Sequence, residues 1–280
     1  MWIRRVGLLA ALSVSAFSVG VSGANAGAPA AGAQPSTAAV VTLPLPAGWV
    51  NFHTEIVAHR GDVAVAPPNT PASVTAAFHN GADAAEFDVQ ETKDHQLVVM
   101  HDTDLAANTV NCTGNVNKIT YAQYRTCKTA DGSIAPNLFE TLKPVRDAGK
   151  RVFIHVKTVG GHKLAPQYMK AVNKYGLNRG DHAVFFSDQE PMLAELRTAG
   201  AANVGLIFNN KLAKQGWAST YPILVPFMTP VTAAEVRAAQ ARGQMVYPVE
   251  SHPLTVEQAK ALGVDGFLTN NLANALTVLG

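Results

Sequence analysis

The chain has 280 residues, of which 48% are hydrophobic and 15% are charged. This composition is typical of a globular protein with a large apolar core, and it excludes a disordered tail, a collagen-like rod and a small disulfide-dense domain. Lys and Arg number 22 against 20 Asp and Glu, with no basic stripe along the chain. We therefore expect no nucleic-acid partner.

Residues 1–26 have the pattern of a secretory signal peptide. Arg4 and Arg5 precede an apolar stretch over residues 6–22. Ala24 and Ala26 then place small residues around a cleavage site after Ala26. An uncleaved membrane anchor is the alternative, but Ser and Gly dilute the stretch, which is marginal for the roughly 20 residues of a bilayer span. We expect a secreted protein without stable membrane insertion.

Residues 27–48 are rich in Ala, Gly, Pro and Ser and predict a flexible leader. The folded domain is then expected over residues 49–280, a length that fits one α/β barrel. The chain has two cysteines, Cys112 and Cys127, 15 positions apart. Because an exported chain passes through an oxidising compartment, we expect a disulfide between them, with two buried free thiols as the alternative.

Apolar runs of strand length recur through the expected domain and alternate with helical patterns. The runs are Glu55–His59, Ala85–Val89, Leu97–His101, Val152–Lys157, Ala183–Ser187, Val204–Phe208, Ile223–Phe227, Met245–Val249 and Gly266–Thr269. The helical patterns are Pro71–Asn80, Leu138–Ala148, Leu164–Tyr175, Glu190–Thr198, Ala233–Ala241 and Val256–Leu262. Repeated strand–helix units predict a parallel sheet with right-handed crossovers, here a TIM-type (β/α)8 barrel.

The predicted barrel has one strand-like run too many. Residues 90–96 are too few for a crossover helix, so one run in this region should be peripheral. Residues 102–136 hold both cysteines and lack a clear strand, which predicts a loop insertion after the third strand that forms a lid or a substrate wall. A doubly wound open sheet is the alternative fold, but no Gly-x-Gly-x-x-Gly follows a strand.

Polar residues close many of the predicted strands, at the end where active sites of such barrels lie. They are His59, Arg60, Glu86, Asp88, His101, Asp102, His155, Lys157, Ser187, Glu250 and Asn270. Glu86 and Asp88 are two apart on one strand and should project to the same side. Because two close carboxylates repel each other, a divalent cation such as Mg, Ca or Mn would stabilise the pair. A solvated pair on an amphipathic strand is the alternative.

Two histidines accompany the carboxylates. His59 and His101 each follow an apolar strand, and imidazoles on either side of a phosphate suit the roles of general base and general acid. Arg60 and Lys157 are the expected contacts of the phosphate oxygens.

The order of these residues resembles that of the glycerophosphodiester phosphodiesterases. The matching motifs are Ala58-His59-Arg60-Gly61, Pro68-Asn69-Thr70, Gly81-Ala82-Asp83, Glu86-x-Asp88-Val89, Thr92-Lys93-Asp94, Leu97-Val98-Val99, His101-Asp102 and Gly263-Val264-Asp265-Gly266. The resemblance is dense over residues 56–102 and sparser to the C-terminus. It implies a TIM-like barrel that hydrolyses phosphodiesters to glycerol 3-phosphate and an alcohol, with one divalent metal ion.

The resemblance also implies roles for individual residues. His59 and His101 would be the acid/base pair, and a hydroxyl of the substrate would attack phosphorus to give a cyclic phosphate. Glu86 and Asp88 would be metal ligands, and Arg60 and Lys157 would bind phosphate. The small-molecule phosphodiester is the one partner implied, and the oligomeric state is left open.

Three positions depart from the family pattern. The family usually has Glu at Pro68, Glu at His155 and Asp at Asn270, so this chain lacks three carboxylates of the expected rim. His155 would then ligate a borderline metal such as Zn or Mn, and Glu250 would restore a carboxylate. The alternatives are a catalytically weakened barrel that binds a phosphate ligand, or phospholipase or sphingomyelinase D-like activity on lipid phosphodiesters.

Overall fold

A computed structural model describes residues 53–158, 163–251 and 254–280. The expected signal peptide and leader, residues 1–48, lie outside the described residues. In the described part of the chain, no helix combines the length and apolar character that crossing a bilayer requires.

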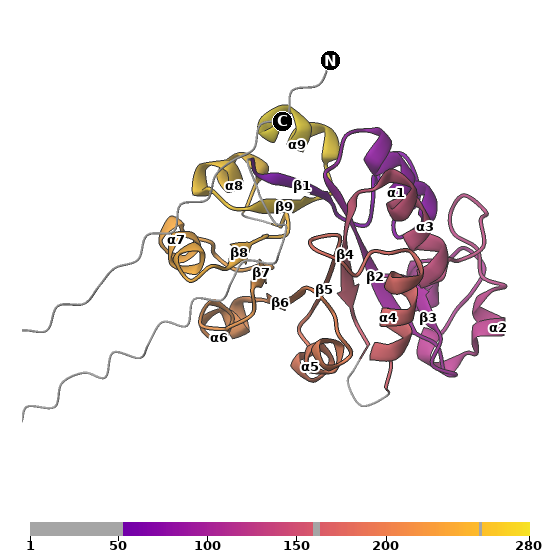
Figure 1. Cartoon of the computed structure of the whole chain (residues 1–280). Helices are drawn as coiled ribbons and strands as arrows, with labels where there is room; N and C mark the ends of the chain where they lie inside the picture. Colours follow the sequence, from indigo (N-terminus) through magenta and orange to yellow (C-terminus); the bar gives the residue numbers. More distant parts are fainter. Residues whose placement is uncertain (1–52, 159–162, 252–253) are drawn as a thin grey trace, which may run out of the picture. The chain divides into compact units, whose positions relative to one another are not determined.

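Eight parallel strands form the central sheet, and helices flank it (Figure 1). The strands, in spatial order, are β8 (Met245–Val246), β7 (Ile223–Pro226), β6 (Val204–Phe208), β5 (Ala183–Ser187), β4 (Arg151–Val156), β2 (Ala84–Glu91), β1 (Glu55–Ala58) and β9 (Gly266–Thr269). Beyond β8, Leu268 N–H donates to the Pro248 carbonyl at 3.0 Å and Glu250 N–H donates to the Leu268 carbonyl at 2.7 Å. These bonds join the two ends of the sheet, which confirms a TIM-type barrel.

The peripheral strand is β3 (Leu97–Val99). It pairs antiparallel with β2 and lies off the barrel path. This arrangement follows from the short connection over residues 92–96, which allows a hairpin but no crossover. The predicted run Met245–Val249 is shorter in the structure, where only Met245–Val246 forms β8. Pro226 at the end of β7 has no N–H to continue the ladder with β8.

The helices confirm the six predicted patterns within one residue at each end and add further ones. The longer helices are α1 (Pro71–His79), α3 (Leu138–Ala148), α4 (Ala165–Lys174), α5 (Glu190–Thr198), α7 (Ala233–Ala241), α8 (Val256–Leu262) and α9 (Leu272–Leu279). Two short helices, α2 (Tyr121–Tyr124) and α6 (Ala213–Trp217), lie between them. The predicted patterns had no counterpart to α9, whose sequence LANALTVL is apolar on most sides, nor to α6, which contains Gly216.

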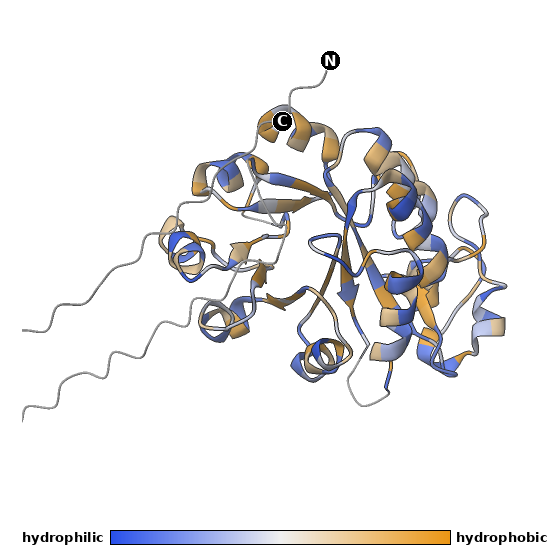
Figure 2. Ribbon diagram, in the orientation of Figure 1, coloured by the Kyte–Doolittle hydropathy of each residue, from blue (hydrophilic) through white to orange (hydrophobic). Residues whose placement is uncertain are grey.

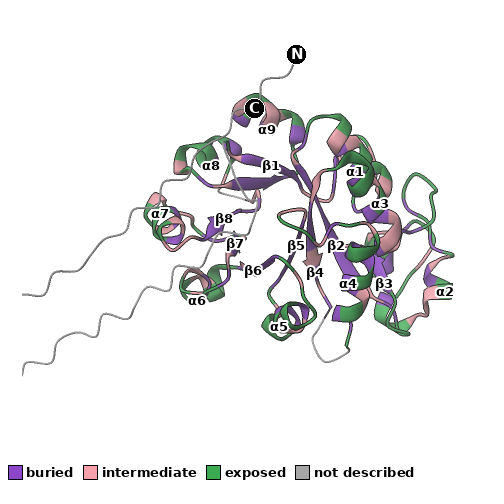
Figure 3. Ribbon diagram, in the orientation of Figure 1, coloured by how far each residue is buried: buried purple, intermediate pink, exposed green. Residues whose placement is uncertain are grey.

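Strand side chains alternate between two cores. Ile56, Phe87 and Ile154 point outward into a core shared with the helices, while Val57, Phe153 and Tyr247 belong to a second core inside the barrel. Figure 2 shows apolar stretches on the strands, hydrophilic stretches on β2 and β4, and helices of mixed colour, and Figure 3 shows the strands mostly buried and the outer helix faces exposed. The strands therefore present alternate residues to the barrel interior, as the period of two requires.

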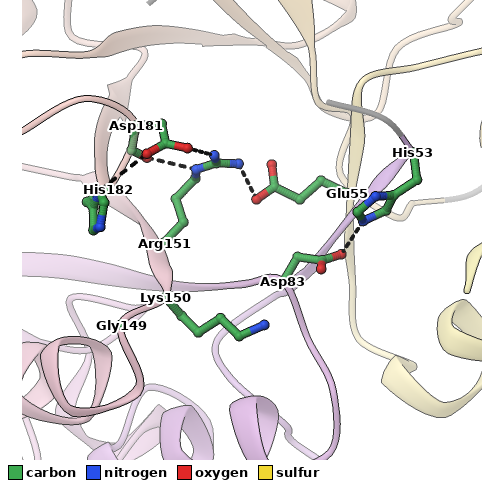
Figure 4. A pocket seen from close by; sticks show the side chains of 8 residues that line it. All are labelled: His53, Glu55, Asp83, Gly149, Lys150, Arg151, Asp181 and His182. Atoms are coloured by element: carbon green, nitrogen blue, oxygen red, sulfur yellow. Dashed lines mark hydrogen bonds and ion pairs between the residues drawn. The ribbon is translucent and has the colours of Figure 1, made fainter. Parts of the chain in front are cut away.

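A network of charged side chains closes the N-terminal end of the barrel (Figure 4). Arg151 lies between Glu55 and Asp181 and forms an ion pair with each. The other carboxylate oxygen of Glu55 accepts a hydrogen bond from the Tyr247 hydroxyl at 2.6 Å. Although burial raises the pKa of Glu55, its partners satisfy both oxygens. The network borders a pocket of about 260 Å³ and ties together residues at the beginnings of β1, β4 and β5.

The insertion over residues 102–136 has a small core of its own. Leu105, Val116, Tyr124 and Cys127 are buried in a cluster with residues that flank β3. Cys112 and Cys127 form the expected disulfide. Because this core is small, we expect the crosslink to contribute much of the stability of the insertion.

Replacing both cysteines, Cys112→Ser with Cys127→Ser, should lower the free energy of unfolding by about 3 kcal/mol, because the unfolded chain regains the entropy of a 15-residue loop. Urea unfolding followed by circular dichroism measures the change. An unchanged midpoint with an unchanged slope would contradict the assigned contribution.

Candidate active site

The interior positions of β2 place three polar side chains in one row, after an alanine. Because alternate residues face inward, Ala84, Glu86, Asp88 and Gln90 share the inner side of the strand, while Phe87 is in the outer core. Glu86 and Asp88 are both fully buried. Both predicted carboxylates therefore face the barrel interior, and the solvated alternative is excluded.

The parallel register with β4 brings His155 beside Asp88. The His155 Nδ1 atom lies 2.9 Å from Asp88 Oδ1, and its ring stacks on Phe186 with 4.7 Å between centroids. Lys157, two residues further along, places its Nζ atom 3.4 Å from the same oxygen. His155 and Lys157 therefore both contact one oxygen of Asp88.

The connection after β1 supplies the partners of the other Asp88 oxygen. Asn69 Nδ2 donates to Asp88 Oδ2 at 3.0 Å, Asn69 Oδ1 accepts from Asp88 N–H at 2.9 Å, and Arg60 Nε lies 3.4 Å from Oδ2. Although burial alone would raise the pKa of Asp88, the His155 hydrogen bond and the charges of His155 and Lys157 hold it far below its usual value. Asp88 is thus ionised, and both of its oxygens have partners.

Backbone geometry allows these contacts. Arg60 has φ of 63° and Asn69 has φ of 62°, both in the left-handed region, which asparagine tolerates better than most residues. Gly61 follows with φ of 81°, and a Cβ atom there would lie 2.4 Å from Ser73 Oγ. The turn therefore requires glycine at position 61, and it directs the Arg60 N–H toward Glu86.

Glu86 has a different environment from Asp88. Its Oε2 atom accepts the Arg60 N–H at 2.9 Å, whereas Oε1 is buried without a hydrogen-bond partner among the described residues. Burial, and next the charge of Asp88, raise the pKa of Glu86 well above its usual value. A buried, unpartnered carboxylate oxygen is stabilised by a proton or by a cation.

The donor set fits a divalent cation. One ligand atom each from Glu86, Asp88 and His155 lie within 4.8 Å of one another. Two carboxylates with one imidazole suit a borderline metal such as Mn or Zn better than Ca, which prefers six to eight oxygen ligands. Glu250 is not part of this group; its Oε2 atom instead accepts hydrogen bonds from Thr269 Oγ1 and Asn270 N–H.

His59 is held by Asn270. The His59 Nδ1 atom lies 2.9 Å from Asn270 Oδ1, and its Nε2 atom lies 3.8 Å from Glu86 Oε2. Because the side-chain oxygen of Asn270 accepts, the His59 proton is on Nδ1 and the lone pair is on Nε2, to which none of the described residues donates a hydrogen bond. Burial, and next the charge of Arg60, lower the pKa of His59 to about 4.

His101 borders the same pocket from the start of the insertion. Its Nδ1 atom lies 3.0 Å from Asp102 Oδ1. Burial lowers the pKa of His101, an effect that the charge of Asp88 opposes. The two imidazoles therefore have partners of different charge, a neutral amide for His59 and a carboxylate for His101.

One pocket of about 240 Å³ brings the predicted residues together. Its lining includes His59, Arg60, Glu86, Asp88, His101, His155 and Lys157, together with Asp188, Asn209 and the apolar residues Phe186, Ile207, Phe208, Leu212, Phe227, Val249 and Leu268. Pro68 borders a separate pocket, beside the insertion. Asn69 and Asn270 have structural roles here that the sequence analysis did not assign; the left-handed preference of asparagine was the available signal for Asn69.

Comparisons with known proteins place this site in a family. The family model of the glycerophosphoryl diester phosphodiesterases matches residues 59–274. The glycerophosphodiester phosphodiesterase of Caldanaerobacter subterraneus subsp. tengcongensis is 28% identical over 235 residues, covering 78% of this chain and 94% of the relative. That of Bacillus altitudinis is 44% identical over 72 residues, 26% of this chain and 29% of the relative.

Solved structures share the fold. The crystal structure of a phosphodiesterase from Silicibacter pomeroyi, described as putative, matches with a TM-score of 0.70 at 20% identity, covering 83% of this chain and 94% of that chain. A phosphodiesterase of Oleispira antarctica, solved with its product sn-glycerol-3-phosphate, matches with a TM-score of 0.67 at 18% identity, covering 81% and 97%. This chain therefore belongs to the glycerophosphoryl diester phosphodiesterase family, a family of phosphoric diester hydrolases.

Proposed function

We propose that the protein hydrolyses glycerophosphodiesters to glycerol 3-phosphate and an alcohol, aided by one divalent cation. The observation that carries the proposal is the pocket in which three histidines, two cationic side chains and a buried carboxylate pair meet. The family membership supports the same reaction. The proposal includes export of the protein, for which the pattern of residues 1–26 is the support.

Arg60 and Lys157 would bind the phosphodiester. Both border the pocket and each forms an ion pair with Asp88, so their charges are fixed in place before a substrate arrives. A phosphodiester anion adjacent to both gains charge-assisted hydrogen bonds. The two cations balance the charges of Glu86 and Asp88, and the pocket can thus accept an anion without a large excess of negative charge.

His59 and His101 have different environments, and we expect each to carry out a different proton transfer. His59 is neutral with its lone pair on Nε2, so it would take the proton from the attacking hydroxyl of the glycerol moiety. Burial lowers the pKa of His101, but the charge of Asp88 and the hydrogen bond with Asp102 oppose this effect. His101 would therefore carry the proton that it donates to the departing alcohol oxygen. Attack by the neighbouring hydroxyl gives a cyclic phosphate, which water then opens.

The cation would be held by Glu86, Asp88 and His155, with the unpartnered Glu86 Oε1 as the principal ligand atom. When bound, it supplies positive charge for the oxygens of the phosphoryl group as negative charge develops there. Glu86 then need not take up a proton to remain buried.

The purified protein should hydrolyse glycerophosphocholine in the presence of Mn²⁺ or Zn²⁺. Glu86→Gln should weaken cation binding, measured by calorimetry, and abolish hydrolysis, because the buried ligand oxygen loses its charge. His59→Ala and His101→Ala should each lower kcat on the order of 10² or more. Glu91→Gln, on the same strand and not among the pocket residues, is the matched control and should behave as the unmodified protein.

An unmodified protein that hydrolyses no glycerophosphodiester with Mg²⁺, Ca²⁺, Mn²⁺ or Zn²⁺ would overturn this function and favour a phosphate-binding protein. Hydrolysis that persists undiminished in Glu86→Gln would remove the carboxylate from the mechanism.

The low pKa of His59 should also be visible in the stability of the protein. The unfolded-state pKa is near 6.5 and the folded-state pKa is about 4. As the pH falls through this window, the unfolded chain binds the proton first. The contribution of neutral His59 to the free energy of unfolding is therefore fully present above pH 6.5 and is lost as the pH falls toward 4. Between pH 7 and pH 5 the unmodified protein should lose about 2 kcal/mol more than His59→Asn. Urea titrations at the two pH values give this difference; equal losses would show that His59 is not held neutral.

A further inference from the structure

The main chain of His101 is held from two sides by side chains. On one side, Asn108 Oδ1 accepts a hydrogen bond from the His101 N–H at 3.2 Å and a longer one from the Asp102 N–H at 3.5 Å. On the other side, Gln90 Nε2 donates to the His101 carbonyl at 2.9 Å. His101 follows the short strand β3, so side chains rather than a sheet ladder fix its main chain.

Asn108 reaches this position because of the local fold of the insertion. A turn of 3₁₀ helix over Leu105–Ala107 begins at Asp104 and ends at Asn108, whose N–H donates to the Leu105 carbonyl at 3.1 Å. Leu105 is buried and anchors the turn in the core of the insertion. The Asn108 Nδ2 atom then donates back to the carbonyls of Asp102 at 3.3 Å and Asp104 at 2.8 Å.

Asn108 contacts the main chain of both His101 and Asp102, and Asp102 is the residue that orients the His101 imidazole. The ring is oriented by Asp102, whose Oδ1 atom lies 3.0 Å from Nδ1. Asn108 contacts the N–H and the carbonyl of Asp102 as well as the N–H of His101. A rotation of this backbone would therefore displace the imidazole and its carboxylate partner together.

Gln90 provides the complementary contact from the barrel. It is 7% exposed and lies two residues after Asp88 on the inner side of β2. Its side chain thus connects the strand that carries the buried carboxylates to His101, which directly precedes the insertion and borders the same pocket.

We propose that Asn108 and Gln90 are positioning residues for His101: they fix its main chain from opposite sides, so that the imidazole stays at the wall of the pocket. This inference rests on the proposed function, in which His101 transfers a proton. It assigns the insertion a role in catalysis through the 3₁₀ turn that carries Asn108. A displacement on the order of 1 Å at a catalytic group lowers the rate strongly, since proton transfer requires hydrogen-bond contact.

The insertion offers a matched control at Asn111. Its Nδ2 atom donates to the Thr126 carbonyl at 3.0 Å and its Oδ1 atom accepts from the Lys128 N–H at 2.7 Å. Asn111 thus bridges backbone groups in the same insertion as Asn108 does, but it contacts neither His101 nor Asp102.

The test compares Asn108→Ala, Asn111→Ala and Gln90→Met with the unmodified protein on glycerophosphocholine. Asn108→Ala should lower kcat on the order of tenfold or more with KM within about twofold, and Gln90→Met should have an effect of the same kind. Asn111→Ala should leave both constants within about twofold. Loosening of the insertion in general would instead affect Asn108→Ala and Asn111→Ala alike, which would overturn the assignment.

Amide hydrogen exchange gives a second readout that needs no turnover. In Asn108→Ala the amides of His101 and Asp102 should exchange faster, whereas the amides of the barrel strands, β4 among them, should exchange as in the unmodified protein. In Asn111→Ala the amides of His101 and Asp102 should be unaffected. Unchanged exchange at His101 in Asn108→Ala would refute the contact that carries this proposal.

The two proposals fail in distinguishable ways. An unmodified protein without hydrolytic activity refutes the proposed function, while the exchange rates still decide whether Asn108 holds the His101 peptide. An active protein whose Asn108→Ala and Gln90→Met variants keep full kcat refutes the positioning role alone.

Discussion

The candidate site depends on the buried, ionised carboxylate of Asp88. Asn69, Arg60, His155 and Lys157 all direct a polar nitrogen at its two oxygens. An isolated charge at such a position would strongly destabilise the fold. Removing one partner from a buried ion pair commonly lowers the free energy of unfolding by several kcal/mol. Asp88 therefore holds two cationic side chains and one imidazole in place at once, and these come from β4 and the connection after β1.

Glu86 differs from Asp88 although it lies only two residues away on the same side of β2. It has one oxygen satisfied by the Arg60 N–H and one without a partner among the described residues. The pKa shifts of the two carboxyl groups are accordingly in opposite directions. The two carboxylates would accordingly have separate tasks in the proposed function: Asp88 holds the surrounding cationic side chains, and Glu86 Oε1 would bind the proposed cation. The departures at Pro68 and His155 are consistent with a site in which fewer carboxylates contact that charge.

The alternation of side chains between the two sides of a strand was the main basis for predicting the site from the sequence. The period of two placed Glu86 and Asp88 on the inner side, and the strand–helix order predicted the barrel and a peripheral strand, which is β3. Contacts that depend on side chains from distant segments could not be predicted in this way. The hydrogen bonds of Asn270 to His59 and of Asn69 to Asp88 arise only when β9 and the connection after β1 meet at the barrel rim. The role of Asn108 depends on a 3₁₀ turn too short to give a periodic pattern.

Diffraction from crystals soaked in Mn²⁺ with glycerol 3-phosphate would test the central claim most directly, because anomalous scattering locates the ion independently of activity. We predict an anomalous peak in contact with Glu86 Oε1, with His155 and Asp88 around it and phosphate oxygens near Arg60 and Lys157. A carboxylate of Glu86 turned away from the pocket, or an ion bound elsewhere while Glu86 Oε1 stays unpartnered, would contradict it.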